Sequence, residues 1–397
     1  MAKPKLALIP AAQGTKLYSV LPSDGTGDFT FTRGSVATRI NSQGLIENVA
    51  SGVSRLDYPM IDGVQKGCPH HILEPARTNL ILNSQKISLT PTKAGTFVDN
   101  FAISPDGTLN ATKLTATDVD PYFYQNISYS AVSYTASIYI KGIGNSVGKE
   151  FQIRLGTNIY TDVIPLEWTR FKYTVTMASG VTSAGLEIPN PAVVGDEVLV
   201  WGWQVEVGSF PTSYIPTNGE SGGVTRSAET ASGAGNSTTF NDSEGVLMAE
   251  ISALANDSTN RQMTLSDGTN DNRLVLKYDN QSNIIQSFNR ISGVESAFLS
   301  ASVTDITLFS KCLVKYKVND YQLWINGFKL DTDTSASVWP TSTLNDLRIN
   351  AGGGADFYGN VKQLQYFDSA IADTQLEQLT SWTSFTDMAN GQLYTIE

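Results

Sequence analysis

The chain has 397 residues, 41% of them hydrophobic, which is enough for cores in about two to three domains and excludes a disordered polymer. Its 27 Lys and Arg against 38 Asp and Glu give a net charge of -11, spread without a basic stripe, which argues against a nucleic-acid partner. The two cysteines, Cys68 and Cys312, are too far apart in sequence to indicate a disulfide framework or a zinc knuckle.

The first residues carry no clear targeting signal. The apolar run Leu6 to Ile9 is too short for a signal-peptide core and is stopped by Pro10. No later stretch approaches the roughly 18 apolar residues of a membrane span, so we expect no membrane insertion. We therefore expect a soluble protein made in the cytosol, with any later location reached by assembly.

Short runs rich in Val, Ile, Thr, Tyr and Phe dominate the chain, with a period of two and with Gly, Asn, Asp and Ser between them. This pattern predicts an all-β protein of tandem β-sandwich, jelly-roll domains. Residues 1–84 have fewer clean strands and many turn residues, which predicts an irregular, elongated or partner-dependent N-terminal β module. A boundary near residue 85 separates this module from regular strands that continue to residue 217.

Three strands of the 85–217 region show clear alternation. FKYTVTM places Phe171, Tyr173, Val175 and Met177 on one face, and YTASIYI does the same for Tyr134, Ala136, Ile138 and Ile140. VLVWGWQVEV is expected to place Leu199, Trp201, Trp203, Val205 and Val207 on one face, with Gln204 and Glu206 opposite. Each strand is thus predicted to cover a core on one side and to meet polar surroundings on the other.

Residues 218–242 are rich in Gly, Ser and Thr and are predicted to be a linker to a second sandwich at 243–397. In that sandwich, Asn326-Gly327 lies between two alternating runs and predicts a tight hairpin. The segment FDSAIADTQLEQL predicts one short C-terminal helix, with a Thr374/Glu377 capping box and an apolar stripe of Ile371, Leu376 and Leu379. This helix is expected to cover the sandwich.

The residue types that most often carry chemistry are scarce. His70 and His71, the only histidines, follow Cys68, but adjacent side chains on a strand point to opposite faces, so a shared zinc ion is disfavoured. We expect a structural role, with one imidazole buried and the other exposed. Gly144 to Gly148 matches G-x-S-x-G, but a strand-like run follows Ser146 where a nucleophile elbow needs a helix.

Acidic runs at residues 24–28, 267–272 and 331–335 are explained by solvated turns, and none has the spacing of an EF-hand. No cofactor is expected, and a weak calcium site between such loops is the alternative. No strand of the C-terminal domain presents a pair of carboxylates for glycoside cleavage. The remaining candidates are aromatic side chains that could stack on sugar rings, Trp324, Trp339 and Tyr358, against the alternative that they cover the ends of a core.

The strings FTRGSVATRINSQGLIENV, SRLDY and HILEPARTNLILNS resemble an N-terminal module of bacteriophage virion proteins, especially fibre and adhesin-like components, in which an LEPxRTNL strand follows an ATRVNxxGLIE hairpin. The resemblance covers residues 28 to 84. WGWQVEVGSFPTSYIPTNG resembles the closing strand of the carbohydrate-binding-module-like jelly roll that follows in such proteins. The C-terminal part is similar to the concanavalin-A-like lectin and laminin-G sandwich.

The resemblance implies a structural, non-enzymatic virion component, a head or tail fibre that forms a homo-oligomer, with a trimer as the expected number. Its partners would be its own copies, other virion proteins of the capsid or tail, and host-surface polysaccharide. A polysaccharide depolymerase on the same scaffold and a free bacterial lectin are the alternatives. The motif residues Arg39, Asn41, Glu74, Arg77 and Asn79 suit charge-assisted hydrogen bonds between turns and strands. Arg77→Ala is therefore expected to impair folding or incorporation, and His71→Ala to leave assembly nearly intact.

Overall fold

The computed structural model describes residues 2–10, 17–61, 64–65, 68–117, 121–349 and 355–381. Its internal contacts divide the chain into two compact units. Unit 1 comprises Met1–Arg33, Gly52–Pro75 and Glu229–Glu397, and unit 2 comprises Gly34–Ser51 and Ala76–Ala228. The chain therefore passes between the units four times, after Arg33, Ser51, Pro75 and Ala228.

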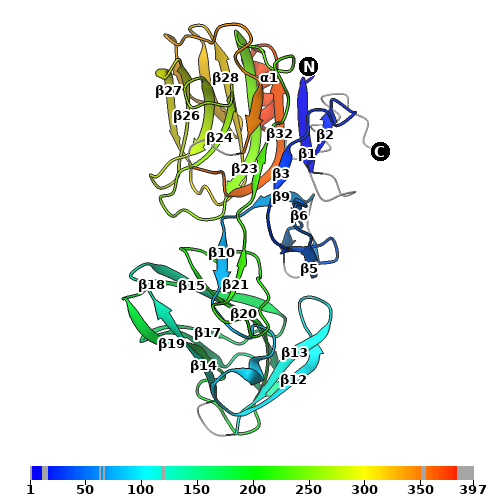
Figure 1. Cartoon of the computed structure of the whole chain (residues 1–397), viewed down its shortest axis with the longest axis vertical. Helices are drawn as coiled ribbons and strands as arrows, with labels where there is room; N and C mark the ends of the chain where they lie inside the picture. The colour runs from blue at the N-terminus through cyan, green and yellow to red at the C-terminus, as the bar shows by residue number, and fades with distance from the viewer. Residues whose placement is uncertain are drawn as a thin grey trace. The chain divides into compact units, whose positions relative to one another are not determined.

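Unit 1 is a β-sandwich of two antiparallel sheets (Figure 1). The nine-stranded sheet has the order β2-β1-β32-β23-β28-β29-β30, and in addition β9 pairs with β32 and β6 pairs with β9. Its strands are β1 (Leu6–Pro10), β2 (Leu17–Leu21), β6 (Arg55–Asp57), β9 (His70–Leu73), β23 (Glu244–Ala253), β28 (Ser310–Lys317), β29 (Tyr321–Ile325), β30 (Phe328–Asp333) and β32 (Gly359–Phe367). The five-stranded sheet has the order β27-β26-β25-β24-β31, with β24 (Arg261–Ser266), β25 (Arg273–Tyr278), β26 (Ile284–Ile291), β27 (Val294–Ser302) and β31 (Asp346–Arg348).

The core of unit 1 lies between these sheets. Leu247 and Leu323 from the first sheet and Leu276 and Leu299 from the second are fully buried in one apolar cluster. Alternation along each strand supplies these side chains, because every second residue of a strand points to the same face. Two short two-stranded ladders complete the unit, β3 (Thr30–Thr32) with β22 (Thr230–Ser232) and β7 (Met60–Ile61) with β8 (Val64–Gln65).

Residues 1–84 do not form a unit of their own, in contrast to the predicted N-terminal module. Strands β1 and β9 both pair with β32, where Leu8 lies opposite Leu364 and His71 opposite Val361. Leu73 is buried in the same core as the C-terminal strands. These short segments are too small to bury their apolar side chains alone, so they complete the C-terminal sandwich instead.

The predicted C-terminal helix is present as α1 (Asp373–Ser381). Leu376 and Leu379 are buried with Ile371 against Val246, Leu313 and Trp324, so the helix covers the outer side of the nine-stranded sheet, as expected. The helix begins at Asp373, so Thr374 lies inside its first turn and not at the N-cap. The Asn326-Gly327 hairpin between β29 and β30 is also confirmed, with positive φ angles of 49° and 90° at the two turn residues.

Unit 2 is a second β-sandwich of two five-stranded antiparallel sheets. One sheet has the order β11-β14-β19-β16-β17, with β11 (Thr92–Ala94), β14 (Tyr122–Tyr129), β16 (Glu150–Leu155), β17 (Asn158–Val163) and β19 (Gly180–Glu187). The other has the order β12-β13-β20-β15-β18, with β12 (Thr96–Ile103), β13 (Leu109–Thr115), β15 (Ser133–Ile143), β18 (Thr169–Thr176) and β20 (Glu197–Val207). Unit 2 also contains the ladders β4 (Ala37–Ile40) with β5 (Ile46–Val49) and β10 (Arg77–Asn79) with β21 (Val224–Arg226), and the 3-10 turns η1 (Ile87–Leu89) and η2 (Gly144–Ser146).

The predicted core faces of β15 and β18 are confirmed, but that of β20 is partly wrong. Val198 and Val200 face the core before Gly202, whereas Trp203 and Val205 face it afterwards. The pairing register of β20 with β15 shifts at this point, and Gly202 has a φ of 67°. A β-bulge inserts one extra residue and therefore reverses the alternation along the strand.

The predicted linker 218–242 is ordered and partly buried. It contributes β21 to unit 2 and β22 to unit 1, and Ala231 and Ala234 are fully buried in the core of unit 1. The composition misled the prediction because small side chains suit close packing of backbones as well as flexible connections. The all-β fold class with tandem sandwiches and one short helix is nevertheless confirmed.

Candidate functional site

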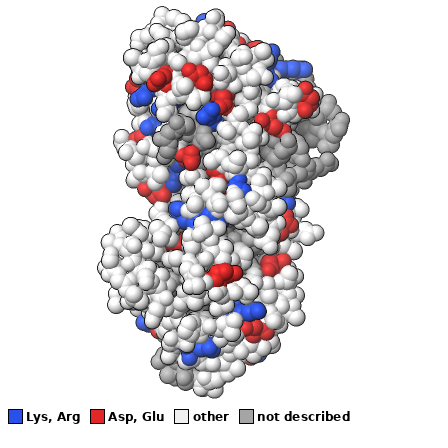
Figure 2. All heavy atoms as spheres, viewed as in Figure 1, with Lys and Arg blue, Asp and Glu red and all other residues white. Residues whose placement is uncertain are grey.

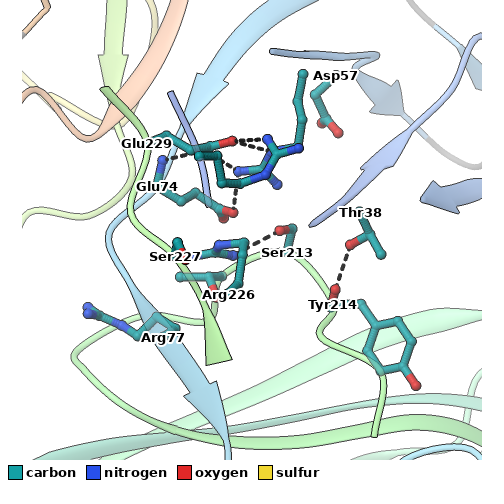
Figure 3. A network of polar contacts seen from close by, with 12 residues as sticks. Thr38, Asp57, Glu74, Arg77, Ser213, Tyr214, Arg226, Ser227 and Glu229 are labelled. Carbon is teal, nitrogen blue, oxygen red and sulfur yellow. Dashed lines mark hydrogen bonds and ion pairs between the residues drawn. The ribbon is translucent and has the colours of Figure 1, made fainter. Parts of the chain in front are cut away.

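A buried cluster of four charged side chains lies in unit 1, formed by Arg33, Arg55, Glu74 and Glu229. Figure 3 shows the polar network around the two glutamates, which are labelled there. Arg33 Nη1 donates to Glu229 Oε1 at 2.6 Å, and Arg55 Nη2 donates to Glu74 Oε2 at 2.8 Å. Arg55 also donates to both carboxylate oxygens of Glu229, through Nε at 2.8 Å and through Nη2. All four side chains are 3% exposed or less, so two cations and two anions form a neutral group away from water.

The backbone closes this cluster. The amide of Glu74 donates to Glu229 Oε2 at 2.9 Å, and the amide of Glu229 donates to the carbonyl of Glu74 at 3.1 Å. Burial alone lowers the pKa of Arg55, but the charges of Glu74 and Glu229 outweigh it and raise that pKa above its ordinary value. The cluster therefore stays charged, and its charges are compensated internally.

The four residues lie at the unit 1 ends of the four chain crossings. Arg33 ends the first segment of unit 1 and Glu229 begins the last, while Arg55 and Glu74 lie near the two ends of Gly52–Pro75. The cluster thus joins segments that are up to 196 residues apart in sequence. Glu74 is one of the predicted motif residues, whereas Glu229 was not predicted; its only signal is that it is an acidic residue inside a Gly-, Ser- and Thr-rich segment.

Both histidines lie on β9 beside this cluster and both are buried, which corrects the expectation that one is exposed. The ring centroids of His71 and Phe31 lie 5.6 Å apart, and those of His70 and Phe309 also lie 5.6 Å apart. Burial lowers the pKa of His71 to about 4 and that of His70 to about 3. His70 Nε2 is 3.9 Å from a carboxylate oxygen of Asp57, but because the imidazole is neutral at pH 7 this is no ion pair.

Two of the predicted motif residues, Arg39 and Asn41, hold the β4–β5 hairpin of unit 2. Arg39 Nη2 lies 2.6 Å from Glu47 Oε1, and Asn41 Nδ2 donates to Glu47 Oε2 at 2.9 Å. Asn41 Oδ1 also accepts from the backbone amides of Gln43 and Leu45, which closes the turn. Burial on its own raises the pKa of Glu47, but the hydrogen bonds from Asn41 and Arg39 outweigh it. The pKa therefore lies below its ordinary value and the carboxylate stays ionised.

Asn79 of unit 2 makes four side-chain hydrogen bonds. It is fully buried, its Nδ2 donates to the carbonyls of Trp203 and Ile215, and its Oδ1 accepts from the amides of Ile81 and Val205. These four bonds fix three separate segments of the unit. Asn79 is therefore an internal anchor.

Arg77 is less tightly held than Asn79. Its side chain is 20% exposed, its Nε lies 3.8 Å from Glu206 Oε2, and its guanidinium lies over the Phe210 ring at 5.4 Å. Glu206 is fully buried and accepts from the amide and the hydroxyl of Thr212, while burial raises the pKa of its carboxyl group. The motif residues thus lie in three places: Glu74 in the charge cluster of unit 1, Arg39 and Asn41 in the β4–β5 hairpin, and Arg77 and Asn79 on β10 of unit 2. In each place their role is architectural.

Two of the three predicted sugar-stacking aromatics are buried. Trp324 is 6% exposed beneath α1, and its Nε1 donates to Gln322 Oε1 at 2.8 Å. Trp339 is 3% exposed, packs edge-to-face on Tyr316, and donates to the carbonyl of Arg290. Tyr358 is half-buried and donates to Asp356. Helix α1 covers the face of β29 on which Trp324 lies, and Trp339 packs in the core of unit 1, so both belong to a core, as in the alternative, and neither can act as a sugar platform.

The acidic runs form local turns. Asp24 accepts from the amide and hydroxyl of Thr26, Asp267 does the same with Thr269, and Asp333 with Ser335. Within the described part of the chain, no group of three or more His, Cys, Asp or Glu side chains could hold a metal ion. In the same ranges, no helix is long and apolar enough to span a bilayer.

Comparison with known proteins found distant structural matches only. No family model and no curated protein sequence matches the chain. A carbohydrate-binding module, CBM40, of the IT-sialidase of Ruminococcus gnavus, solved with α2,3-sialyllactose, is 17% identical with a TM-score of 0.32, and the alignment covers 38% of this chain and 93% of that one. Similarity this distant says nothing about the ligand or activity of this chain.

Two further matches extend over more of the chain. Domains LG4-5 of the mouse laminin α1 chain are 9% identical with a TM-score of 0.25, over 72% of this chain and 96% of that one. The tandem CBM22 domains of Xyn10C from Paenibacillus barcinonensis are 9% identical with a TM-score of 0.24, over 74% and 99%.

Proposed function

We propose that this chain is a structural, non-enzymatic component of a bacteriophage virion. It would be a head or tail fibre that assembles as a homo-oligomer, with a trimer expected, and would display its β-sandwiches toward host-surface glycans. The resemblance of residues 28–84 to virion fibre proteins is the starting point. Contacts of the same residues within the two units provide the structural support.

The observation that carries the proposal is the internal use of the motif. Arg55 and Glu74 are buried in the charge cluster of unit 1, and Asn79 is buried with four hydrogen bonds in unit 2. Side chains used in this way position backbone segments and are not available to a substrate. A sequence motif with such contacts specifies a scaffold, which agrees with a virion component more closely than with a catalytic domain.

The non-enzymatic part of the proposal draws on three buried basic or nucleophilic side chains, those of His71, Cys312 and Ser146. His71 is neutral and buried, and burial raises the pKa of the Cys312 thiol to about 12. Ser146 is also buried, and its hydroxyl accepts from the amide of Glu197. None of these three groups has the exposure or the ionisation state that nucleophilic catalysis at neutral pH requires.

The surface charge is compatible with a glycan-facing role. On the face drawn in Figure 2, Lys and Arg are interspersed with Asp and Glu in small groups, between large uncharged areas. Among the described residues of that face there is no continuous basic stripe, which agrees with the net charge of -11. Nucleic acid is therefore not a proposed partner.

The test is to locate the chain in particles. Antibody labelling in electron microscopy and mass spectrometry of washed, purified virions should find the chain in fixed copy number. Light scattering of the purified protein should give three times the chain mass of 42.9 kDa. A chain found only free in the culture medium would establish the lectin alternative, and release of reducing ends from host capsule would establish the depolymerase alternative.

A further inference from the structure

The outward face of one sheet of unit 2 carries a compact group of aromatic and polar side chains. Tyr122 and Tyr124 on β14 point away from the core, since Phe123 between them is fully buried in it. Strand pairing places Glu187 opposite Tyr122, and Gln152 opposite Glu187 on the next strand. We call this group the Tyr122 patch and define it as Tyr122, Tyr124, Gln152, Arg154, Glu187 and Asn190.

The aromatic part of the Tyr122 patch is a stacked pair. The two tyrosine rings lie 4.8 Å apart with an interplanar angle of 24°, and both side chains are partly exposed. Gly185 leaves the room for this arrangement, because a Cβ there would lie 1.8 Å from Tyr124 Cδ1. A glycine at this point of β19 therefore lets the ring of Tyr124 lie across the strand.

The polar part is held by Glu187. Its carboxylate accepts from the hydroxyl of Tyr124, from Arg154 Nη2 at 2.8 Å and from Asn190 Nδ2 at 2.8 Å. Arg154 Nη2 also donates to Gln152 Oε1 at 2.7 Å. Burial and, as the second cause, the hydrogen bond to Glu187 raise the pKa of Tyr124, so its hydroxyl stays a donor at any physiological pH.

Several hydrogen-bonding groups of the Tyr122 patch have no protein partner among the described residues. They are Arg154 Nε, which is buried, Arg154 Nη1, Gln152 Nε2, Asn190 Oδ1 and the hydroxyl of Tyr122. The set contains both donors and acceptors beside an aromatic surface. A hydroxyl-rich ring with one apolar face is the class of ligand that satisfies both.

The charge of the patch narrows the ligand class. The guanidinium of Arg154 is already paired with Glu187, and the exposed Glu150 lies on the same face of β16, two residues before Gln152. Among the described residues of the Tyr122 patch there is therefore no unpaired cation for a carboxylated or sulfated sugar. An acidic ligand would meet a net negative surface.

We infer that the Tyr122 patch binds a neutral, pyranose-containing saccharide. The apolar face of a sugar ring lies on the ring of Tyr122, while its hydroxyls accept from Arg154 and Gln152 and donate to Asn190. This inference rests on the proposed function, since it locates on one sandwich the glycan contact that a displayed fibre would make.

Affinity electrophoresis of the full chain in native gels tests it. The gels contain one neutral polysaccharide each (mannan, galactan, dextran or mixed-linkage β-glucan) or one acidic polysaccharide (alginate or polygalacturonate). At least one neutral polysaccharide should retard the chain, and Tyr122→Ala should raise the dissociation constant about tenfold or more. Phe101→Ala is the matched control, because it removes a 45% exposed aromatic side chain from the other sheet of the same unit and should leave retardation unchanged.

Three results would overturn the inference: no retardation by any neutral polysaccharide, retardation by acidic ones only, or wild-type retardation of Tyr122→Ala. Gln152→Ala, a smaller change on the same face, should weaken retardation as well and keeps the test decisive if Tyr122→Ala melts early. Virions carrying Tyr122→Ala should still contain the chain. Its loss from particles would concern the proposed function, whereas loss of binding with normal incorporation concerns the patch.

Discussion

Substitution of Glu229 by Gln gives the sharpest test of the buried charge cluster. Glu229 accepts four hydrogen bonds, from Arg33, twice from Arg55 and from the amide of Glu74. The change leaves two buried guanidiniums with one carboxylate, that of Glu74. Removal of one partner from a buried ion pair costs about 3–5 kcal/mol, mainly because the remaining charge is uncompensated. We therefore expect Glu229→Gln to lower the free energy of unfolding of unit 1 by about 4 kcal/mol.

Urea denaturation followed by tryptophan fluorescence measures this loss, since Trp324 and Trp339 are buried in unit 1. The matched control is Glu244→Gln in the same unit. It removes a surface ion pair in which the side chain of Glu244 is 29% exposed and that of Lys317 is 52% exposed. Such pairs contribute at most about 1 kcal/mol. The reasoning would be refuted if Glu229→Gln and Glu244→Gln differed by less than about 1 kcal/mol.

A second variant separates charge from packing. Arg33→Met combined with Glu229→Gln leaves Arg55 and Glu74, which form a neutral pair at 2.8 Å. The double variant should therefore lose less free energy than the sum of the two single variants, by about 1 kcal/mol or more. Strict additivity would indicate that the cluster acts through shape alone.

Three further predictions concern single side chains. The pKa of His71 is lowered from 6.5 to about 4 in the folded state, so between pH 7 and pH 5 the unfolded state takes up a proton while folded His71 stays neutral. The free energy of unfolding should therefore fall by about 2 kcal/mol over this pH range. His71→Phe should reduce that acid sensitivity in urea titrations at both pH values; an unchanged difference between pH 7 and pH 5 would contradict it. Trp324→Ala should cost about 3–5 kcal/mol because it empties the space beneath α1, whereas Tyr358→Ala at a half-buried position should cost much less, as measured by thermal unfolding. Asn79→Ala should destabilise unit 2 by about 3 kcal/mol or more because it leaves four buried backbone groups unpaired. The control Thr78→Ala removes one exposed hydroxyl contact. Equal melting temperatures of the two variants would argue against an anchor role for Asn79.

Alternation and turn chemistry were enough to predict the elements whose side chains meet neighbours close in sequence. The Asn326-Gly327 hairpin follows from backbone conformations that these two residues adopt easily, and the helix follows from an apolar stripe. The same logic failed at β20, because a bulge at Gly202 changes the alternation by one residue. A bulge depends on the partner strand, and no local pattern reports it.

The site residues show the same division. Glu74, Arg77 and Asn79 stood out in one continuous motif, yet their partners Glu229, Glu206 and the carbonyl of Ile215 come from more than 100 residues away. The Tyr122 patch was not predicted, because its tyrosines, Arg154 and Glu187 lie on three different strands, and the order of these strands in the sheet cannot be derived from the sequence. Trp324 stayed a candidate for sugar stacking beside the core alternative, because alternation indicates a face of a strand but not what covers that face.

By itself, the sequence determined the all-β class, the hairpin, the helix and the polar motif, since these depend on backbone conformation and on the side-chain period of each segment. Only the tertiary structure decided that the N-terminal segments complete the C-terminal sandwich, that both histidines are buried, and that Glu229 compensates two arginines. The physical reason is that burial and charge compensation are set by neighbours brought together by strand pairing, and in this chain those neighbours are separated by up to 196 residues.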